Sequence, residues 1–471
     1  MTGITTIIEQ LRNIVGADNL LAGTAAAPYC KDWRGRYTGT ALAVVLPADT
    51  RQVADVVTLC AANNIAMVPQ GGNTSLCGAS VPLAGELPQL VVNLSRMNRI
   101  RSLDATNYTM TVEAGCKLAD LYQAAEQAGR LFPLGLTAIA PHCEIGGNLS
   151  TNAGGVGVLR YGSARDLVLG LEVVLPDGRI WEGLRSLRKD NTGYDLKQLF
   201  VGAEGTLGII TAAVLKLFPR PQSTATACIA VRDPAAAVEL LAHLRARCGD
   251  TISAFELVSR SCLDLVFKNI PDTHEPFPGD RHDWIVIAQL SDVLPEPLDA
   301  PFSVALQEFD ERVLEYTVTT DPAQAEAWWK LRKSISDAQK IEGISVKHDV
   351  SVPVSRVAEF IERASTELGA EFPGIRIVAF GHMGDGNIHY NASMPDAAQN
   401  AGFISNHEHA VNRIVYGIVA QLNGSISAEH GLGQLKREEI TRYKDALELE
   451  LMRSIKQTLD PHGLMNPGKV V

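Results

Sequence analysis

The chain has 471 residues, more than the about 250–300 residues that one hydrophobic core supports, so at least two domains are expected. Hydrophobic residues make up 46% of the sequence and charged residues 20%, a balance typical of a packed globular protein that excludes a disordered or fibrous chain. The net charge of -11, without a basic cluster to offset it, disfavours binding to nucleic acid.

The N-terminal stretch carries Ile4, Ile7 and Leu11 at helical spacing but no basic segment followed by a cleavage site, so we expect a surface helix of the mature protein. The longest apolar runs, such as residues 41–46, are far shorter than the about 20 residues of a membrane-spanning helix. Eight scattered cysteines without a C-x-x-C pair favour free thiols in a reducing compartment. We therefore expect a cytoplasmic protein whose association with membranes, if any, is peripheral.

From residue 37 to residue 219 short β-branched runs alternate with helical stretches, which predicts a mixed α and β domain. The expected strands and helices of this region are residues 41–46, 53–63, 66–69, 109–113, 118–128, 171–175 and 207–217. The sequence predicts an α+β fold with a first domain over residues 1–221 and a second domain over residues 222–444. A helical tail over residues 445–471, broken at Pro461 and Gly463, is expected to return to the first domain.

Glycines are concentrated in the first domain. Residues 69–75 follow a predicted strand, and successive glycine N–H groups can form a concave nest that holds a diphosphate without a lysine. Residues 146–155 form a second such segment. Each loop taken alone is weak evidence for such a site, and a plain glycine-rich turn is the favoured interpretation of either one. Neither matches the dinucleotide fingerprint or the phosphate-binding P-loop, so a nicotinamide Rossmann domain and a P-loop are disfavoured.

These loops resemble the FAD-binding domain of the vanillyl-alcohol-oxidase and p-cresol-methylhydroxylase type. The resemblance rests on residues 69–76, 133–137, 145–155, 160–162, 171–178 and 202–210. It implies that the diphosphate of FAD lies on residues 71–74. Some members of this type attach FAD through a histidine of the first loop; this loop holds Asn73 and no histidine, so we expect non-covalent FAD.

The cofactor-binding residues expected from this resemblance are Pro69, Gly71, Gly72, Asn73, Thr74, Ser75, Pro133, Gly135, Thr137, Gly146, Gly147, Asn148, Thr151, Asn152, Gly154, Tyr161, Gly162, Glu204, Gly205, Ile209, Ile210 and Asn466.

The string from Gly381 to Asn391 points to a metal site. Asp385-Gly386 is a preferred dipeptide of a two-residue hairpin turn, and a hairpin centred there makes His382 and His389 direct cross-strand partners on one face. Asn391 points to the same side, because side chains alternate along a strand. A hairpin pair of histidines alone also allows a purely structural interpretation.

A second segment, residues 427–433, decides between these interpretations. It places Glu429 and His430 side by side in a glycine-flanked loop. Two histidines and one carboxylate form a ligand set with an open position, typical of catalytic zinc. His430 then becomes the candidate general base. Asp385 is an alternative carboxylate ligand, but the turn that it occupies directs its side chain away from the face of the two imidazoles. We therefore assign it a structural role.

Both segments, with residues 329–332, 347–353 and 465–469, resemble the FAD-linked D-2-hydroxy-acid dehydrogenases over nearly the whole chain. The resemblance implies that His382, His389 and Glu429 bind zinc or another divalent metal. It implies that the substrate is bound by Arg332, Ser336, Lys347, Asn391 and His430. Ser336, four residues after Arg332, is expected on the same helix face. One branch of the family commonly has threonine at the position of Ser336, and this difference leaves the substrate preference open.

The implied activity is oxidation of a small D-2-hydroxy acid, foremost D-2-hydroxyglutarate to 2-oxoglutarate, with hydride transfer to FAD. The alternatives are a D-lactate, D-malate or glycolate dehydrogenase of the same family and a non-redox member of the same flavin fold. The sequence has no iron–sulfur ligand set, so a separate acceptor, an electron-transfer flavoprotein or a quinone, is expected to take the electrons. A homodimer is compatible with the sequence.

Overall fold

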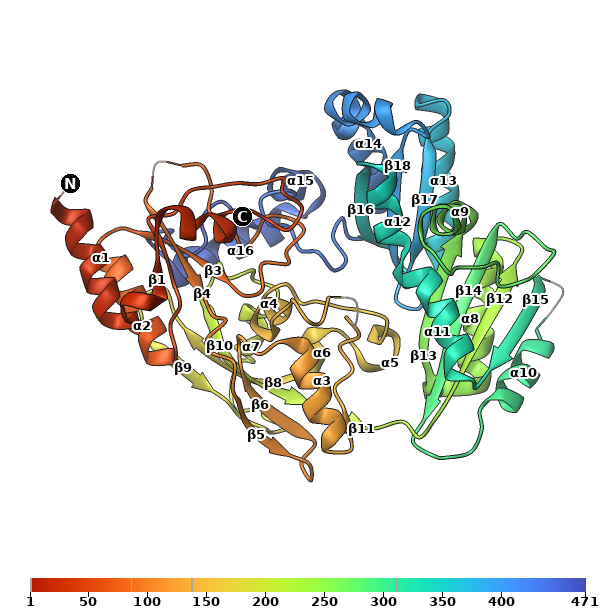
Figure 1. The fold of residues 1–471 in the computed structure, drawn as a ribbon, viewed down its shortest axis with the longest axis horizontal. Helices are drawn as coiled ribbons and strands as arrows, with labels where there is room; N and C mark the ends of the chain where they lie inside the picture. Colours follow the sequence, from red (N-terminus) through yellow and green to blue (C-terminus); the bar gives the residue numbers. More distant parts are fainter. Residues whose placement is uncertain (1, 86, 137–138, 310–311) are drawn as a thin grey trace. The chain divides into compact units, whose positions relative to one another are not determined.

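The structure, a computed structural model, describes residues 2–85, 87–136, 139–309 and 312–471 (Figure 1). Contacts divide the chain into two compact units. The first comprises Met1–Gly154, Ser163–Pro219 and Glu429–Val471, and the second comprises Gly155–Gly162 and Arg220–Ala428. Each unit combines helices with sheets, so the α+β fold class expected from the sequence is confirmed. The domain limits given above at residues 221 and 444 stay predictions.

The first unit is built on two main sheets. A four-stranded sheet has the order β1 (Leu20–Leu21), β2 (Ala43–Val45), β4 (Gln89–Asn93) and β3 (Ala66–Gln70). A five-stranded antiparallel sheet has the order β5 (Ile100–Asp104), β6 (Thr109–Glu113), β10 (Ile209–Lys216), β8 (Val168–Val174) and β9 (Ile180–Gly183). β7 (Arg130–Leu131) pairs with β11 (Phe218–Pro219). β2, β3 and β4 run parallel and are almost wholly buried, as parallel strands usually are.

The helices of the first unit are α1 (Thr2–Val15), α2 (Thr50–Ala62), α3 (Leu118–Gln127), α4 (Ile145–Ser150), α6 (Ala164–Leu167), α7 (Lys197–Phe200), α15 (Arg437–Tyr443) and α16 (Ala446–Leu459). α1 confirms the expected N-terminal helix, and it packs against α2 (Figure 1). Leu11 of α1 and Val53 of α2 are fully buried in the core that covers the four-stranded sheet. α16 confirms the helical tail: Asp445 caps its N-terminus.

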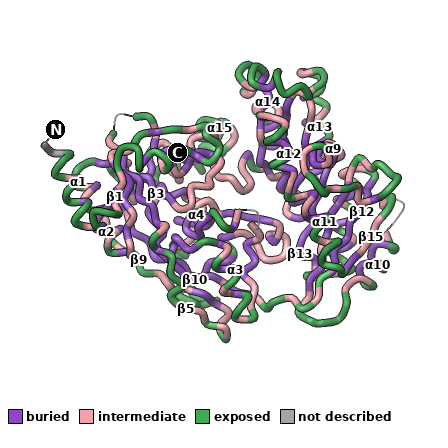
Figure 2. Tube along the Cα trace, viewed as in Figure 1, coloured by how far each residue is buried: buried purple, intermediate pink, exposed green. Residues whose placement is uncertain are grey.

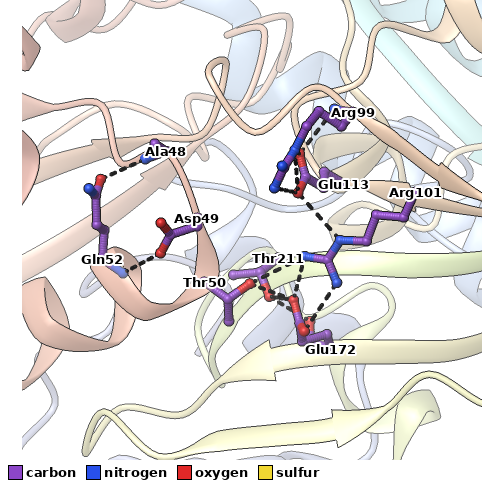
Figure 3. A network of polar contacts seen from close by, with 9 residues as sticks. All are labelled: Ala48, Asp49, Thr50, Gln52, Arg99, Arg101, Glu113, Glu172 and Thr211. Atoms are coloured by element: carbon purple, nitrogen blue, oxygen red, sulfur yellow. Dashed lines mark hydrogen bonds and ion pairs between the residues drawn. The ribbon is translucent and has the colours of Figure 1, made fainter.

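A buried ionic network joins α2 to the five-stranded sheet (Figure 3). Asp49 caps the N-terminus of α2 by accepting from the backbone N–H of Gln52, and the Gln52 side chain accepts from the N–H of Ala48, the residue before the cap. The next residue, Thr50, donates its hydroxyl to Glu172 Oε1 of β8 over 2.5 Å. The same carboxylate accepts two bonds from Arg101, at 3.0 and 3.2 Å.

Arg101 sits at a bulge of β5, where an extra residue re-aims the side chain across the sheet. Its Nε also lies 3.3 Å from Glu113, a fully buried carboxylate of β6 that Arg99 binds as well. Burial raises the pKa of Glu172, but the bonds from Arg101 and two threonine hydroxyls outweigh burial, so the pKa is lowered. The ionised carboxylate is therefore the stable form within this network.

The second unit contains one seven-stranded antiparallel sheet. Its order is β15 (Val313–Thr319), β12 (Ser223–Val231), β14 (Trp284–Asp292), β13 (Ile252–Ser259), β17 (Arg376–Gly381), β18 (Asn387–Ser393) and β16 (Val346–Ser351). The helices are α5 (Val158–Tyr161), α8 (Pro234–Cys248), α9 (Arg260–Asn269), α10 (Asp299–Gln307), α11 (Pro322–Lys333), α12 (Ile335–Glu342), α13 (Val357–Glu371) and α14 (Asn400–Gln421). The central strands are buried, whereas the outer helix faces are exposed (Figure 2). Among the described residues, no helix is both long and apolar enough to cross a membrane.

Replacing Glu172 by glutamine is expected to lower the free energy of unfolding of the first unit by about 1–3 kcal/mol, because Arg101 loses one of its two carboxylate partners. Urea unfolding at neutral pH measures this loss. The lowered pKa of Glu172 means that its contribution is complete above the ordinary value of 4.5 and is lost as the pH falls through the lower folded-state pKa. The difference between wild type and variant should therefore shrink in acid.

The matched control is Asp177→Asn, which breaks the exposed pair of Asp177 with Arg179. This change is expected to alter stability by no more than about 0.5 kcal/mol. Equal losses for the two variants would contradict a stabilising role of the buried network.

Candidate functional site: a flavin pocket and a histidine cluster

The first unit contains a pocket with about 1130 Å³ of empty volume. Its wall is formed by the loop after β3, by α4, by the turn that leads into β10, and by Glu429 and His430. The two glycine-rich segments expected from the sequence to act together are thus brought to one pocket.

Two glycines of these segments show why small residues are needed. A Cβ at Gly72 would lie 1.9 Å from the carbonyl oxygen of His142, so only glycine lets the first loop pack against that segment. A Cβ at Gly147 would meet nothing within 4 Å. Because Gly147 lines the pocket, a side chain there would take up space that the missing Cβ leaves to a ligand.

The pocket wall also contains polar atoms without partners. Glu144 Oε2 and Asn148 Oδ1 are buried and make no hydrogen bond to any described residue. Such atoms cost about 1–3 kcal/mol each unless a ligand or water satisfies them. A pocket with small glycines and unsatisfied polar atoms fits FAD, which offers phosphate, hydroxyl and ring hydrogen-bonding groups.

Most residues expected to bind FAD line this pocket. They are Pro69, Gly71, Gly72, Asn73, Thr74, Ser75, Gly146, Gly147, Asn148, Thr151, Gly154, Glu204, Gly205, Ile209 and Ile210. The others that the structure describes are Pro133, Gly135, Asn152 and Asn466, in the first unit but outside the lining, and Tyr161 and Gly162, in the second unit. Thr137 lies outside the described residues.

Glu204 holds the loop that carries His430. Its two carboxylate oxygens accept the backbone N–H groups of Leu432 at 2.7 Å and Gly433 at 2.8 Å. A Cβ at Gly431 would lie 2.7 Å from this carboxylate, so glycine is needed there too. Burial raises the pKa of Glu204, and the two backbone bonds only partly offset that effect. Asn466 braces the arrangement, since its amide donates to the carbonyl oxygen of Glu204 over 2.7 Å.

In the second unit, one buried carboxylate holds two residues expected in the site. Glu256 of β13, 1% exposed, accepts from Arg332 Nε over 2.7 Å and lies 2.6 Å from His382 Nδ1. Burial raises the pKa of Glu256, but the positive charges of His382 and Arg332 outweigh it and lower the pKa to about 2. The guanidinium of Arg332 also stacks over Phe380, 4.7 Å from the ring centre.

Glu256 was missed by the sequence analysis. A single acidic residue in the otherwise uncharged strand 252–259 was the available signal, because a carboxylate buried in a strand needs a charged partner.

The expected cross-strand pairing of His382 and His389 is wrong. His389 faces Phe380 across the β17–β18 pair, and His382 lies beyond the end of β17. Instead of a two-residue turn at Asp385-Gly386, residues 382–386 form a wider loop in which the N–H of Gly386 donates to the carbonyl of His382 over 3.2 Å. The two imidazole rings nevertheless lie close, with centres 5.6 Å apart.

His389 is next to a carboxylate on the neighbouring strand. Asp349 of β16 is its register partner, and Asp349 Oδ1 lies 3.7 Å from His389 Nδ1. The carbonyl oxygen of Asp349 also accepts the N–H of Ala428 over 3.2 Å. Ala428 is the last residue of the second unit, and Glu429 directly follows it in the chain.

Arg332 and Ser336 do not share one continuous helix. α11 ends at Lys333 and α12 begins at Ile335, because Ser334 has a ψ of -5° rather than a helical value near -42°. Ser336 is exposed on α12. The prediction that Arg332 and Ser336 lie on one face of the same helix is therefore wrong.

Lys347 and Asn391 are neighbours on paired strands. They are register partners of β16 and β18, and both donate to the side-chain oxygen of Gln339, at 3.4 and 3.0 Å. Gln339 is a buried residue of α12 that the sequence analysis missed. It fixes a lysine and an amide side by side, which suits binding of a carboxylate.

Two protein-family profiles match the chain. An FAD binding domain matches residues 41–183, and the C-terminal domain of FAD linked oxidases matches residues 220–470. The chain belongs to the FAD-linked oxidases. FAD is the cofactor of this family of oxidoreductases, as the sequence resemblance implied.

The relatives match over nearly the whole chain. A rice protein (Oryza sativa subsp. indica) named probable D-2-hydroxyglutarate dehydrogenase, mitochondrial, is 37% identical over 93% of this chain and 77% of its own length. A zebrafish protein (Danio rerio) named D-2-hydroxyglutarate dehydrogenase, mitochondrial, is 37% identical over 93% of this chain and 80% of its own length.

The structure of p-cresol methylhydroxylase with substrate bound is similar to this chain in fold, with a TM-score of 0.77 and 18% identity over 100% of this chain and 97% of that chain. The expected p-cresol-methylhydroxylase type of fold is confirmed.

The expected cytoplasmic location is contradicted by these relatives, since both the rice and the zebrafish protein are named mitochondrial. The N-terminal residues and the scattered cysteines, on which that expectation rested, do not identify a compartment.

Replacing Glu204 by glutamine is expected to loosen the loop after His430, because a glutamine offers one acceptor oxygen where the carboxylate serves two N–H groups. Losing one such bond costs about 1–3 kcal/mol, which corresponds to hydrogen exchange about 5- to 150-fold faster at Leu432 and Gly433. Exchange measured by mass spectrometry tests this. The control Glu182→Gln changes an exposed glutamate of β9 and should leave the same peptide unchanged. Unchanged exchange in Glu204→Gln would show that the carboxylate does not hold the loop.

Proposed function

We propose that this protein oxidises D-2-hydroxyglutarate to 2-oxoglutarate with FAD. The observation that carries the proposal is that Arg332 and His382 share the carboxylate of Glu256, so a carboxylate-binding cation is held beside a candidate metal ligand. The relatives named D-2-hydroxyglutarate dehydrogenase support the same substrate.

The residues of the two units have distinct roles in this proposal. The loop residues 71–74 and the segment 146–154 bind non-covalent FAD, and His382, His389 and Glu429 bind a divalent metal, foremost zinc. The donor set fits zinc, which takes imidazole and carboxylate ligands. Glu256 beside His382 and Asp349 beside His389 are carboxylates of the kind that orient metal-binding histidines.

When bound, FAD supplies a hydride acceptor and the metal supplies a Lewis acid. His430 lines the FAD pocket and takes the proton of the substrate hydroxyl at a ring nitrogen. Arg332 binds the distal carboxylate: Nε is committed to Glu256, and the flat guanidinium presents its two amino groups beside it. Lys347 and Asn391 also bind the substrate in this proposal, with Ser336 as a further contact. One proton and one hydride leave the substrate, which yields the 2-oxo acid.

Two further parts of the proposal concern partners, and a third concerns the non-covalent binding of FAD. Reduced FAD passes its electrons to a separate acceptor, an electron-transfer flavoprotein or a quinone. The protein forms a homodimer. The first loop contains Asn73, whose side chain donates to the carbonyl of Lys31 over 2.8 Å, and no histidine for covalent attachment of FAD.

Replacing His382 by alanine is expected to remove the metal and to lower turnover at least about 100-fold, while the flavin spectrum stays nearly unchanged, because the FAD pocket lies in the first unit. Metal content per chain, visible absorbance and turnover are measured on the same preparation. His409→Ala, an exposed histidine of α14 in the same unit, is the control and should keep metal and activity. A fully active protein without stoichiometric metal would contradict the metal proposal.

Replacing Arg332 by alanine is expected to lower kcat/KM for D-2-hydroxyglutarate about 100-fold or more and for D-lactate far less, because D-lactate has no distal carboxylate. Lys333→Ala, which removes an exposed cation of the same helix, is the control. Because Arg332 also contacts Glu256, metal content is measured alongside. Equal losses for both substrates, or equal wild-type kcat/KM for both, would favour a D-lactate dehydrogenase instead.

A further inference from the structure

The wall of the FAD pocket contains a buried carboxyl group with an unsatisfied oxygen, that of Glu144. Glu144 is 5% exposed, and its Oε2 has no hydrogen-bond partner among the described residues. The backbone around it is fixed, because Glu144 forms a β-bridge with Lys117 and the N–H of Ile145 donates to the carbonyl of Cys116 over 3.0 Å. The backbone that carries the carboxyl group is therefore held in place.

The carboxyl group lies between the two glycine-rich segments. A Cβ at Gly71 would be 3.3 Å from Glu144 Oε2 and 3.7 Å from the backbone nitrogen of Gly147. Both glycines line the pocket, so the unsatisfied oxygen borders the space where both segments meet a ligand.

The charged groups around Glu144 do not offset the cost of burying its ionised carboxylate. Lys117 is exposed and makes no hydrogen bond to it; the other titratable neighbours are His142 and the thiols of Cys116 and Cys143. No charged or titratable side chain stands in the first loop, residues 70–75, or in α4. Burial raises the pKa of Glu144 to about 8, and Lys117 lowers it only in part. The raised pKa favours the neutral carboxylic acid, which has a proton to donate, at neutral pH.

We propose that Glu144 is a cofactor-binding residue that holds FAD as the neutral acid, donating its proton in a hydrogen bond to an oxygen of the FAD diphosphate. A diphosphate carries two negative charges and accepts hydrogen bonds, so the acid form attracts it and the ionised form repels it. The first glycine loop, against which the carboxyl packs, contains no lysine or arginine that would otherwise counter the phosphate charge. The inference does not depend on which hydroxy acid is oxidised.

The consequence is a loss of FAD affinity in alkali. A group that must be protonated to bind, with a pKa of about 8, weakens binding about tenfold between pH 7 and pH 9. Glu144→Gln keeps an N–H donor but cannot ionise, so its dissociation constant for FAD should change less than about twofold over this range. Glu144→Ala has no donor and should bind FAD at least about tenfold more weakly at pH 7.

The experiment measures the dissociation constant of FAD from reconstituted apoprotein at pH 7 and pH 9 by quenching of flavin fluorescence. Asp120→Asn, which neutralises an exposed carboxylate of α3, is the control and should keep the tenfold pH effect of the wild type. A wild-type constant that does not change with pH, or an equal change in Glu144→Gln, would overturn the proposal.

A second readout uses the holoenzyme. Phosphorus NMR of bound FAD should show a shift of at least one diphosphate resonance in Glu144→Gln relative to wild type, because the donor atom changes. Circular dichroism first establishes that the variant is folded. Identical phosphorus spectra in a folded variant would show that Glu144 does not contact the diphosphate, whatever its effect on affinity.

Discussion

The buried carboxylate of Glu256 is the interaction on which the second unit's part of the site depends. A carboxylate with 1% exposure is stable only because Arg332 and His382 both bind it, and those two side chains are in turn fixed by it. Glu256 lies on β13, a central strand of the sheet, and it brings together Arg332 and His382, which are far from it and from each other in the sequence. The guanidinium of Arg332 and the imidazole of His382 are therefore held in fixed relation to each other by one carboxylate.

In the first unit the main constraint is that a large anionic cofactor must approach the backbone closely. Glycines at positions such as 72 and 147 let the chain pack tightly on one side and leave room on the other. The Glu204 carboxylate then ties the loop that carries His430 to the turn before β10. The flavin pocket and the candidate base are consequently parts of one packed region rather than independent loops.

The sequence predicted the regular elements well where local patterns are strong. The strand over residues 109–113 matches β6, and the helix over residues 118–128 differs from α3 by one residue. The glycine-rich segments could be found from the sequence because several glycines close together indicate backbone that turns tightly or approaches a ligand. Glu256 and Gln339 were not found, since their importance arises from partners 126 and 52 residues away along the chain. The hairpin at Asp385-Gly386 failed for a related reason: side-chain bonds of Asn387 to Asp349 and to the carbonyl of Val350 accompany a wider turn, and a dipeptide preference cannot report such tertiary contacts.

Anaerobic titration of the purified flavoprotein with hydroxy acids tests the proposed activity most directly, because the flavin absorbance reports substrate oxidation without any electron acceptor. D-2-hydroxyglutarate is predicted to bleach the flavin completely and fast, D-lactate much more slowly, and L-2-hydroxyglutarate not at all. A flavin that D-2-hydroxyglutarate leaves oxidised, or that D-lactate reduces as fast, would contradict the proposal.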